Sequence, residues 1–207
     1  MTAPEGGIKE GGQVFLLYGF HSNETSFTEY GFTDPDAPKD ICIDQTIERL
    51  FQDDAEDGAE KRSLLKKKGY WGWVFCLERY PTLTASSDWT LHAEPSPAHP
   101  SYRLMPALRL LQISLKSEDM VRRWEQTVMG MLEEVSPENT QGLQSTLTGI
   151  CGRYCFEADQ YLVQNKSSES FSELWQRQAM VSIRLLWTQQ REVAALVMES
   201  ISHGIDF

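Results

Sequence analysis

Hydrophobic side chains recur every three or four positions along most of the chain beyond residue 40, which is the spacing of one face of an amphipathic helix. The stripe formed by Ile43, Ile47, Leu50 and Phe51 predicts the first of these helices. Four more helices are expected over residues 102–112, 118–135, 141–162 and 170–201. Because this periodicity dominates the chain, we expect a mainly α fold.

A different pattern precedes these helices. Residues 13–18, Gln-Val-Phe-Leu-Leu-Tyr, form a short β-prone run after two glycines, which predicts a buried strand. A short helix is expected next, with Phe27, Tyr30 and Phe32 facing inward. The chain should therefore open with one strand and one helix.

The turn-forming stretch at residues 33–38, Thr-Asp-Pro-Asp-Ala-Pro, favours a domain boundary. We expect a short β/α unit over residues 1–37 and an α-helical unit over residues 38–207. Within the second unit, residues 81–100 hold four prolines and predict an irregular excursion that carries one short strand near residues 89–91.

Two helix-end signals refine the helical unit. Residues 53–68 are acidic first and basic last, the order that complements a helix dipole, and Gly69 is expected to end that helix. Ser170 and Glu173 have the Ser-x-x-Glu spacing of a capping box, which predicts where the last helix begins.

The charge balance narrows the choice of partners. Nineteen Lys and Arg residues against thirty Asp and Glu residues give a formal net charge of −11. This argues against a nucleic-acid binder, which needs a basic face. It would suit a basic protein partner attracted by charge, although the same acidity is also explained by solubility alone.

The sequence also bears on the compartment. No apolar run is long enough for a membrane-spanning helix, and the Gly-rich first twelve residues do not resemble a secretory signal. Four cysteines are too few and too scattered for a disulfide scaffold, which favours a reducing compartment. We therefore expect no membrane association and a cytoplasmic or nuclear protein that is not secreted.

No metal site is predicted. Cys151 and Cys155 supply two thiols on one helical face, whereas a structural zinc site needs four ligands. His92 and His99 lie in the proline-rich excursion without a partnering pair. The Gly-x-Ser-x-Gly elbow and the phosphate-binding Gly-x-x-x-x-Gly-Lys loop are both missing from the sequence, so acyl transfer and P-loop chemistry have no support.

The stretches at residues 12–23 and 29–32 are distinctive. They read Gly-Gln-Val-Phe-Leu-Leu-Tyr-Gly-Phe-His-Ser-Asn and Glu-Tyr-Gly-Phe. They resemble the closing segment of SET domains of the Rubisco large-subunit lysine methyltransferase type, with Phe20 in place of that family's proline. More loosely, residues 104–111, 151–159 and 177–191 resemble helices of the α-helical substrate-binding domain of the same family.

The resemblance implies methylation of a protein lysine with S-adenosylmethionine as cofactor. It places Tyr18 at the position of the catalytic tyrosine, and Tyr30 and Phe32 at the walls of the lysine channel. A phenol oxygen can align the lysine amine and stabilise the charge that develops on it, and aromatic faces add cation–π attraction. Taken without the resemblance, all three side chains would be ordinary core aromatics.

The sequence departs from this family in one large respect. A complete SET domain has a preceding portion with a Gly-rich cofactor loop and an Asn-His pair, and the chain contains no Asn-His dipeptide. We therefore expect a truncated gene product, a mis-started gene model or a remnant that retains substrate recognition. Alone, it is expected not to bind S-adenosylmethionine or transfer a methyl group.

Two other interpretations stay open. The helical unit could be a non-catalytic protein-interaction module that uses an acidic groove of the same domain. It could also be an unrelated all-helical scaffold. The methyltransferase and the interaction module both imply a protein substrate or partner, and the net negative charge favours a basic one.

Overall fold

A computed structural model describes residues 22–71, 89–165 and 173–205. Within them the chain forms seven helices and three short strands, so the expected mainly α fold is confirmed. In chain order they are α1 (Asn23–Tyr30), β1 (Asp40–Cys42), α2 (Asp44–Asp53), α3 (Gly58–Lys68), β2 (Thr90–His92), β3 (His99–Pro100), α4 (Leu104–Leu111), α5 (Glu118–Val128), α6 (Pro137–Gln164) and α7 (Leu174–Ser202). The strand expected at residues 13–18 lies outside the described residues.

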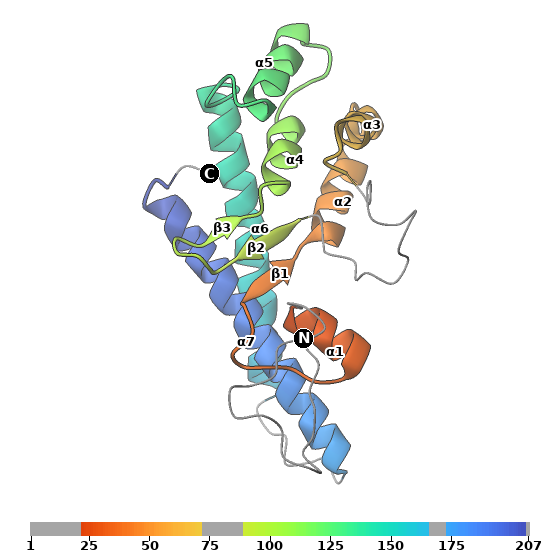
Figure 1. Ribbon diagram of the computed structural model, residues 1–207, viewed down its shortest axis with the longest axis vertical. Helices are drawn as coiled ribbons and strands as arrows, with labels where there is room; N and C mark the ends of the chain where they lie inside the picture. The colour runs from red at the N-terminus through yellow and green to blue at the C-terminus, as the bar shows by residue number, and fades with distance from the viewer. Residues whose placement is uncertain (1–21, 72–88, 166–172, 206–207) are drawn as a thin grey trace, which may run out of the picture.

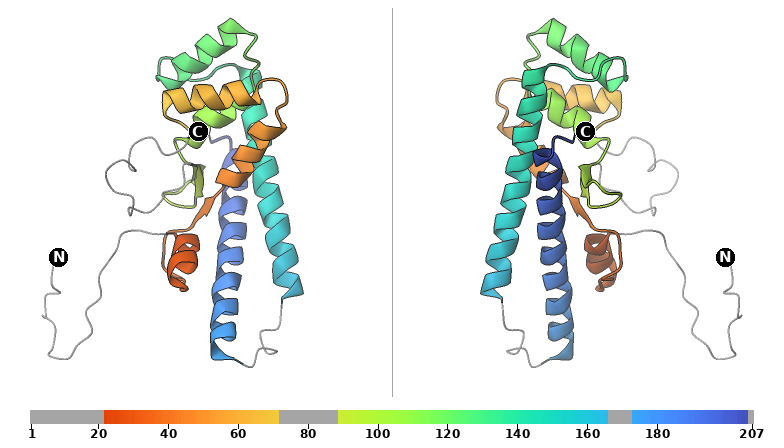
Figure 2. Two further views of the ribbon diagram at one scale, coloured as in Figure 1. Left: turned by 90° about the vertical axis from the view of Figure 1, so that its right-hand side faces the viewer. Right: turned by 90° about the vertical axis from the view of Figure 1, so that its left-hand side faces the viewer.

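The two longest helices, α6 and α7, pack side by side as an antiparallel pair (Figures 1 and 2). They contain 28 and 29 residues, so each is about 40 Å long. The Arg191 guanidinium pairs with the Asp159 carboxylate at 2.6 Å, and the Tyr161 and Trp187 rings stack with centroids 5.1 Å apart. We call the α6–α7 pair the spine, because the other elements are arranged along it.

A three-stranded antiparallel sheet lies across the middle of α7 in the order β1–β2–β3 (Figure 1). Ile41, Leu91 and Pro100 stand opposite one another in adjacent strands, and all three are buried. Lys39, just before β1, pairs with Glu192 of α7 at 2.8 Å. The sheet is thereby tied to the spine.

Helices α2 to α5 gather at one end of the spine, whereas α1 packs against α7 farther along it (Figure 2). Ile47 and Phe51 of α2 are buried as their spacing predicts. The ring of Trp71 contacts Phe51 and Trp89 edge-on, with both centroid distances 4.9 Å. Fully buried Trp124 of α5 donates its indole N–H to the Pro106 carbonyl of α4 at 2.9 Å.

The charge order of residues 53–68 suggested a single helix. The structure instead has a break between α2 and α3, so this stretch does not form one helix. The Asp54 carboxylate accepts the backbone N–H of Asp57, which ends the first helix locally. A Cβ atom at Gly58 would lie 2.1 Å from the Phe51 carbonyl oxygen, so this close approach requires glycine. Gly69, at φ +79°, ends α3 as expected.

Other elements also differ from the pattern: α5 ends earlier than expected, and α6 begins at Pro137 rather than at residue 141. α5 ends at Val128, before residue 135, where Gly130 adopts φ +73°. Ser136 caps the start of α6 by accepting the Asn139 N–H. The expected strand near residues 89–91 is present as β2, but neither β1 nor β3 was predicted. No described helix combines the length and apolar character that crossing a membrane requires.

Candidate functional site

The aromatic residues singled out in the sequence lie at the end of α1. The Ser22 hydroxyl caps the start of this helix by accepting the Thr25 N–H at 3.1 Å. Gly31 ends it at φ +76°. Tyr30 and Phe32 flank this glycine, with ring centroids 6.2 Å apart and planes inclined by 32°. The left-handed Gly31 therefore brings two aromatic rings next to each other.

The expectation that these aromatics face inward is wrong. Tyr30 is 52% exposed, Phe32 is 55% exposed, and Phe27 is only half-buried. The buried positions of α1 are the polar residues Asn23 and Ser26. Tyr30 and Phe32 are thus presented at the surface rather than packed as core.

Asn23 holds α1 and the following turn against α7. Its side-chain oxygen accepts the Asp34 N–H at 2.7 Å, and its side-chain nitrogen donates to the Asp34 carbonyl at 2.7 Å. The same nitrogen lies 3.0 Å from the Gln189 Oε1 atom of α7. Asn23 and Gln189 are 3% and 5% exposed, so these hydrogen bonds are shielded from water. We call this network the Asn23 clamp.

A second contact supports the same turn. The Thr33 hydroxyl donates to the Ser182 hydroxyl of α7 at 3.0 Å. The turn that follows Phe32 is therefore fixed to α7 at two places. Ser22 and Asn23 are thus structural residues that satisfy backbone groups, and Asn23 also helps to fix the position of the aromatic pair.

Tyr18, the expected catalytic residue, lies outside the described residues. Its proximity to Tyr30 and Phe32 stays a prediction, as do the channel roles of those two side chains. The boundary between residues 1–37 and 38–207 stays a prediction as well.

Carboxylates gather beside α1, in a region that no sequence motif marks. Burial, with a smaller contribution from the Glu24 carboxylate, raises the pKa of Asp40 to about 6. Burial and the neighbouring Asp44 carboxylate also raise the pKa of Glu24. The Asp40 carboxylate of β1 and the Glu24 carboxylate of α1 therefore lie in one region where the charged form of a carboxyl group is disfavoured.

Replacing Asp40 with asparagine is expected to stabilise the fold at pH 7.5 by about 1–2 kcal/mol, allowing for solvent screening of this partly exposed group. The folded-state pKa is above the ordinary value of 3.8, so the native state prefers the protonated acid. The contribution of Asp40 to stability is therefore largest below pH 3.8 and is lost as the pH rises through 6. Urea unfolding near pH 4 and at pH 7.5 measures the difference.

The control for this variant is Asp36→Asn, at an exposed position in the preceding turn. It should change the free energy of unfolding by less than about 0.5 kcal/mol at either pH. An equal effect of Asp40→Asn at both pH values would contradict the electrostatic explanation.

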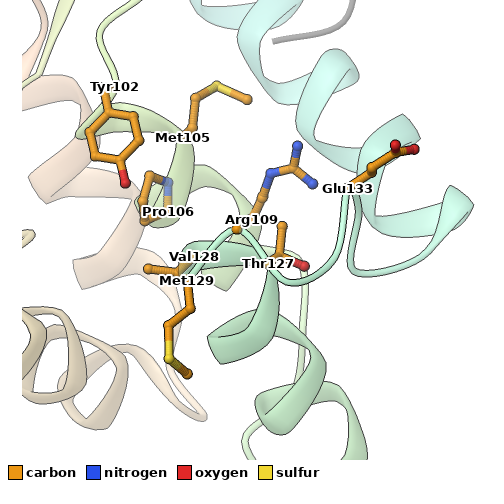
Figure 3. A pocket seen from close by; sticks show the side chains of 9 residues that line it. Tyr102, Met105, Pro106, Arg109, Thr127, Val128, Met129 and Glu133 are labelled. Carbon is orange, nitrogen blue, oxygen red and sulfur yellow. The ribbon is translucent and has the colours of Figure 1, made fainter.

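A separate cavity of about 330 Å³ opens between α4, α5 and the segment after α5 (Figure 3). Met105, Pro106 and Val128 give it apolar walls, and Arg109 lies between these and Glu133. Its rim exposes two large side chains, Tyr102 at 72% and Met129 at 58%. Its lining comes from positions on two helices and a loop, which no sequence motif marks. Such an apolar cavity with charged groups at one side is suited to an amphipathic side chain.

The described residues hold no group of three or more side chains placed to bind a metal ion. Burial raises the pKa of Cys151 to about 12 and also raises the pKa of Cys155, which keeps both as neutral thiols. The rings of His92 and His99 lie next to each other, with centroids 5.5 Å apart. Strand pairing, which the sequence did not reveal, brings them together.

Comparison with known proteins finds a similarity along most of the chain. The chain is similar to SET domain-containing protein 4 of Homo sapiens, with 26% identity over 196 residues. The alignment covers 91% of this chain but only 38% of the length of the human protein. No protein-family model matches the chain. No solved structure matches it significantly.

This similarity supports a relation to SET-domain proteins. It spans nearly the whole chain, so it extends beyond the aromatic stretch that first indicated the resemblance.

Proposed function

We propose that the chain is the closing part of a protein-lysine N-methyltransferase of the Rubisco large-subunit type. It would join the end of the SET domain to the α-helical unit that recognises the protein substrate. The observation that carries this proposal is the similarity to a human SET domain-containing protein along 196 residues. The mainly α fold and the clamped aromatic pair are consistent with it.

The proposed reaction explains the residue types at the site. Tyr30 and Phe32 would surround the lysine side chain, where aromatic faces attract a desolvated cation by about 0.5–2 kcal/mol. The Asn23 clamp would fix the direction from which these rings meet the substrate. Tyr18 would orient the lysine amine through its phenol oxygen, so that the amine is positioned before transfer begins.

The described side chains do not by themselves fit S-adenosylmethionine. The polar groups nearest the aromatic pair are already engaged, Asn23 with Asp34 and Gln189, and Thr33 with Ser182. We propose that the cofactor binds the complete SET domain rather than residues 1–207 alone. No step of the reaction is therefore assigned to the cofactor here.

The substrate is proposed to be a basic protein. The net charge of −11 would attract a positively charged partner over long range and increase the rate of encounter, especially at low salt. A basic protein substrate is consistent with the expected cytoplasmic or nuclear location of this chain.

Replacing Tyr18 with phenylalanine tests the catalytic proposal in a protein extended upstream by any in-frame coding sequence that carries an Asn-His pair. Loss of the hydroxyl is expected to lower the rate of methyl transfer by about 100-fold, the effect of losing one oriented transition-state hydrogen bond. Incorporation of labelled methyl groups into basic nuclear and ribosomal proteins measures the rate. Tyr161→Phe on α6 is the matched control and should leave it unchanged.

The 207-residue chain alone should show no saturable binding of S-adenosylmethionine by calorimetry. Saturable binding would contradict the expectation that the cofactor needs the complete domain. Methyl transfer that is unchanged by Tyr18→Phe would instead contradict the catalytic assignment.

The second candidate function is a non-catalytic protein-interaction module, which the cavity between α4 and α5 favours. A partner would insert an amphipathic side chain beside Arg109 and Glu133. In that case Met129→Glu, at the rim, weakens partner binding, whereas Tyr18→Phe has no effect and the extended protein transfers no methyl group.

A further inference from the structure

Two of the chain's four histidines stand directly opposite each other in the small sheet. His92 of β2 pairs with His99 of β3 in an antiparallel register. Side chains of directly opposed residues project from the same face of a sheet. Both histidines are half-buried rather than enclosed, so solvent and small ions reach them.

Hydrogen bonds to the protein hold one nitrogen of each ring. His99 Nδ1 lies 3.0 Å from the Pro97 carbonyl oxygen, which can only accept, so Nδ1 carries the proton and Nε2 keeps its lone pair. His92 Nε2 lies 2.8 Å from the Thr90 hydroxyl, which leaves Nδ1 outside this contact. This arrangement, in which a protein oxygen fixes one nitrogen and frees the other, is typical of metal-binding histidines.

The spacing of the rings also fits a shared metal ion. A metal–nitrogen distance of about 2.0–2.1 Å puts the ion about 3.2 Å from each ring centroid, so two imidazoles at a tetrahedral angle have centroids about 5.2 Å apart. The observed separation of the His92 and His99 centroids is 5.5 Å. Only a small adjustment of the two side chains would then be needed.

We propose that His92 and His99 form a two-imidazole chelate for a divalent transition-metal ion of the Zn²⁺ and Cu²⁺ class. Imidazole nitrogen suits these ions, and Cu²⁺ binds such ligands most tightly of the first-row series. No third ligand-type side chain among the described residues completes the site. The remaining coordination positions belong to water, so the bound ion is open to exchange.

The histidine at the end of α7 gives a matched control. His203 lies one residue after α7 and is exposed. Its replacement should therefore leave metal binding unchanged, whereas replacement of either sheet histidine removes half of the chelate.

Titration of the full 207-residue chain with Cu²⁺ tests the chelate. We expect one ion per chain, with two nitrogen ligands in the electron paramagnetic resonance spectrum. His92→Gln and His99→Gln should each weaken binding by about tenfold or more and leave one nitrogen ligand, while His203→Gln binds as the unaltered chain does. Zn²⁺ should compete for the site, and Mg²⁺ should not.

Circular dichroism of each variant shows whether the fold is retained. If a glutamine variant unfolds, Thr90→Val offers a second test of the chelate. This variant removes the hydrogen bond to the His92 ring and leaves both imidazoles in place. This variant should still bind one ion through two nitrogens. Absence of saturable Cu²⁺ binding, or an affinity unchanged in both His92→Gln and His99→Gln, would overturn the proposal.

Discussion

Replacing Asn23 with alanine is expected to lower the free energy of unfolding by about 2–4 kcal/mol. The substitution removes two hydrogen bonds to the Asp34 backbone and one to Gln189. A buried polar group left without its partner costs about 1–3 kcal/mol, and these losses add only in part because they belong to one network. Urea unfolding measures the total.

Hydrogen exchange then shows where stability is lost. Amides of α1 should exchange faster in Asn23→Ala, because the helix has lost its main link to α7, while amides of α6 are little affected. The looser α1 would no longer hold Tyr30 and Phe32 in place. In the extended protein, methyl transfer should fall as well if these rings form the lysine channel.

Two variants control this experiment. Asn23→Asp keeps an acceptor for the Asp34 N–H but turns a carboxylate toward the Asp34 and Gln189 oxygens, so it should destabilise at least as much as alanine. Glu29→Ala, on the exposed side of α1, should change stability by less than about 0.5 kcal/mol. A loss below that value for Asn23→Ala would show that the clamp does not hold α1.

The largest expected effect on stability comes from Trp124→Ala, at about 3–5 kcal/mol. Trp124 is fully buried, and its truncation leaves a large cavity beneath α4. It also leaves the Pro106 carbonyl without the indole N–H that it accepts at 2.9 Å. Thermal and urea unfolding measure the loss.

A second tryptophan provides the matched control. Trp175 on α7 is 65% exposed, so Trp175→Ala should cost less than about 1 kcal/mol. The stability loss in Trp124→Phe should fall between those of Trp124→Ala and Trp175→Ala, because phenylalanine fills most of the indole volume but lacks the N–H donor. Equal losses for Trp124→Ala and Trp175→Ala would show that the core at this end of the spine does not depend on Trp124.

The Trp124 variant also affects the cavity. Pro106 lines that cavity and is held to α5 by the Trp124 indole. Partner binding through the cavity should therefore weaken even though Trp124 does not line it. If the chain is an interaction module, Trp124→Ala and Met129→Glu should both weaken partner binding.

Helical periodicity predicted the elements well where one face is buried. The stripe Ile47 and Phe51 became the core face of α2, and Gly69 ended α3 as expected. It failed where local hydrogen bonds or close backbone approach interrupt a helix. Gly58 is such a place, because the close approach of the Phe51 carbonyl is visible only once the chain is folded.

The candidate site shows the same division. Sequence resemblance selected Tyr30 and Phe32, but hydrophobicity alone predicted an inward orientation that is wrong. Helical spacing places Tyr30 on the same side of α1 as the buried polar residues Asn23 and Ser26, so periodicity by itself does not account for its exposure. A polar residue can occupy a buried position only when a partner is present, and the partner of Asn23 on α7 lies 166 residues away in the chain.

The amino-acid sequence by itself determined the class of fold, the helical segments and the stretch that resembles a SET domain, because these depend on side-chain type and short-range spacing. Only the tertiary structure decided which residues meet: Asn23 with Gln189, His92 with His99, and the walls of the cavity between α4 and α5. The physical reason is that hydrogen-bond satisfaction, strand register and desolvation are set by neighbours distant in sequence, and a local pattern does not specify those neighbours.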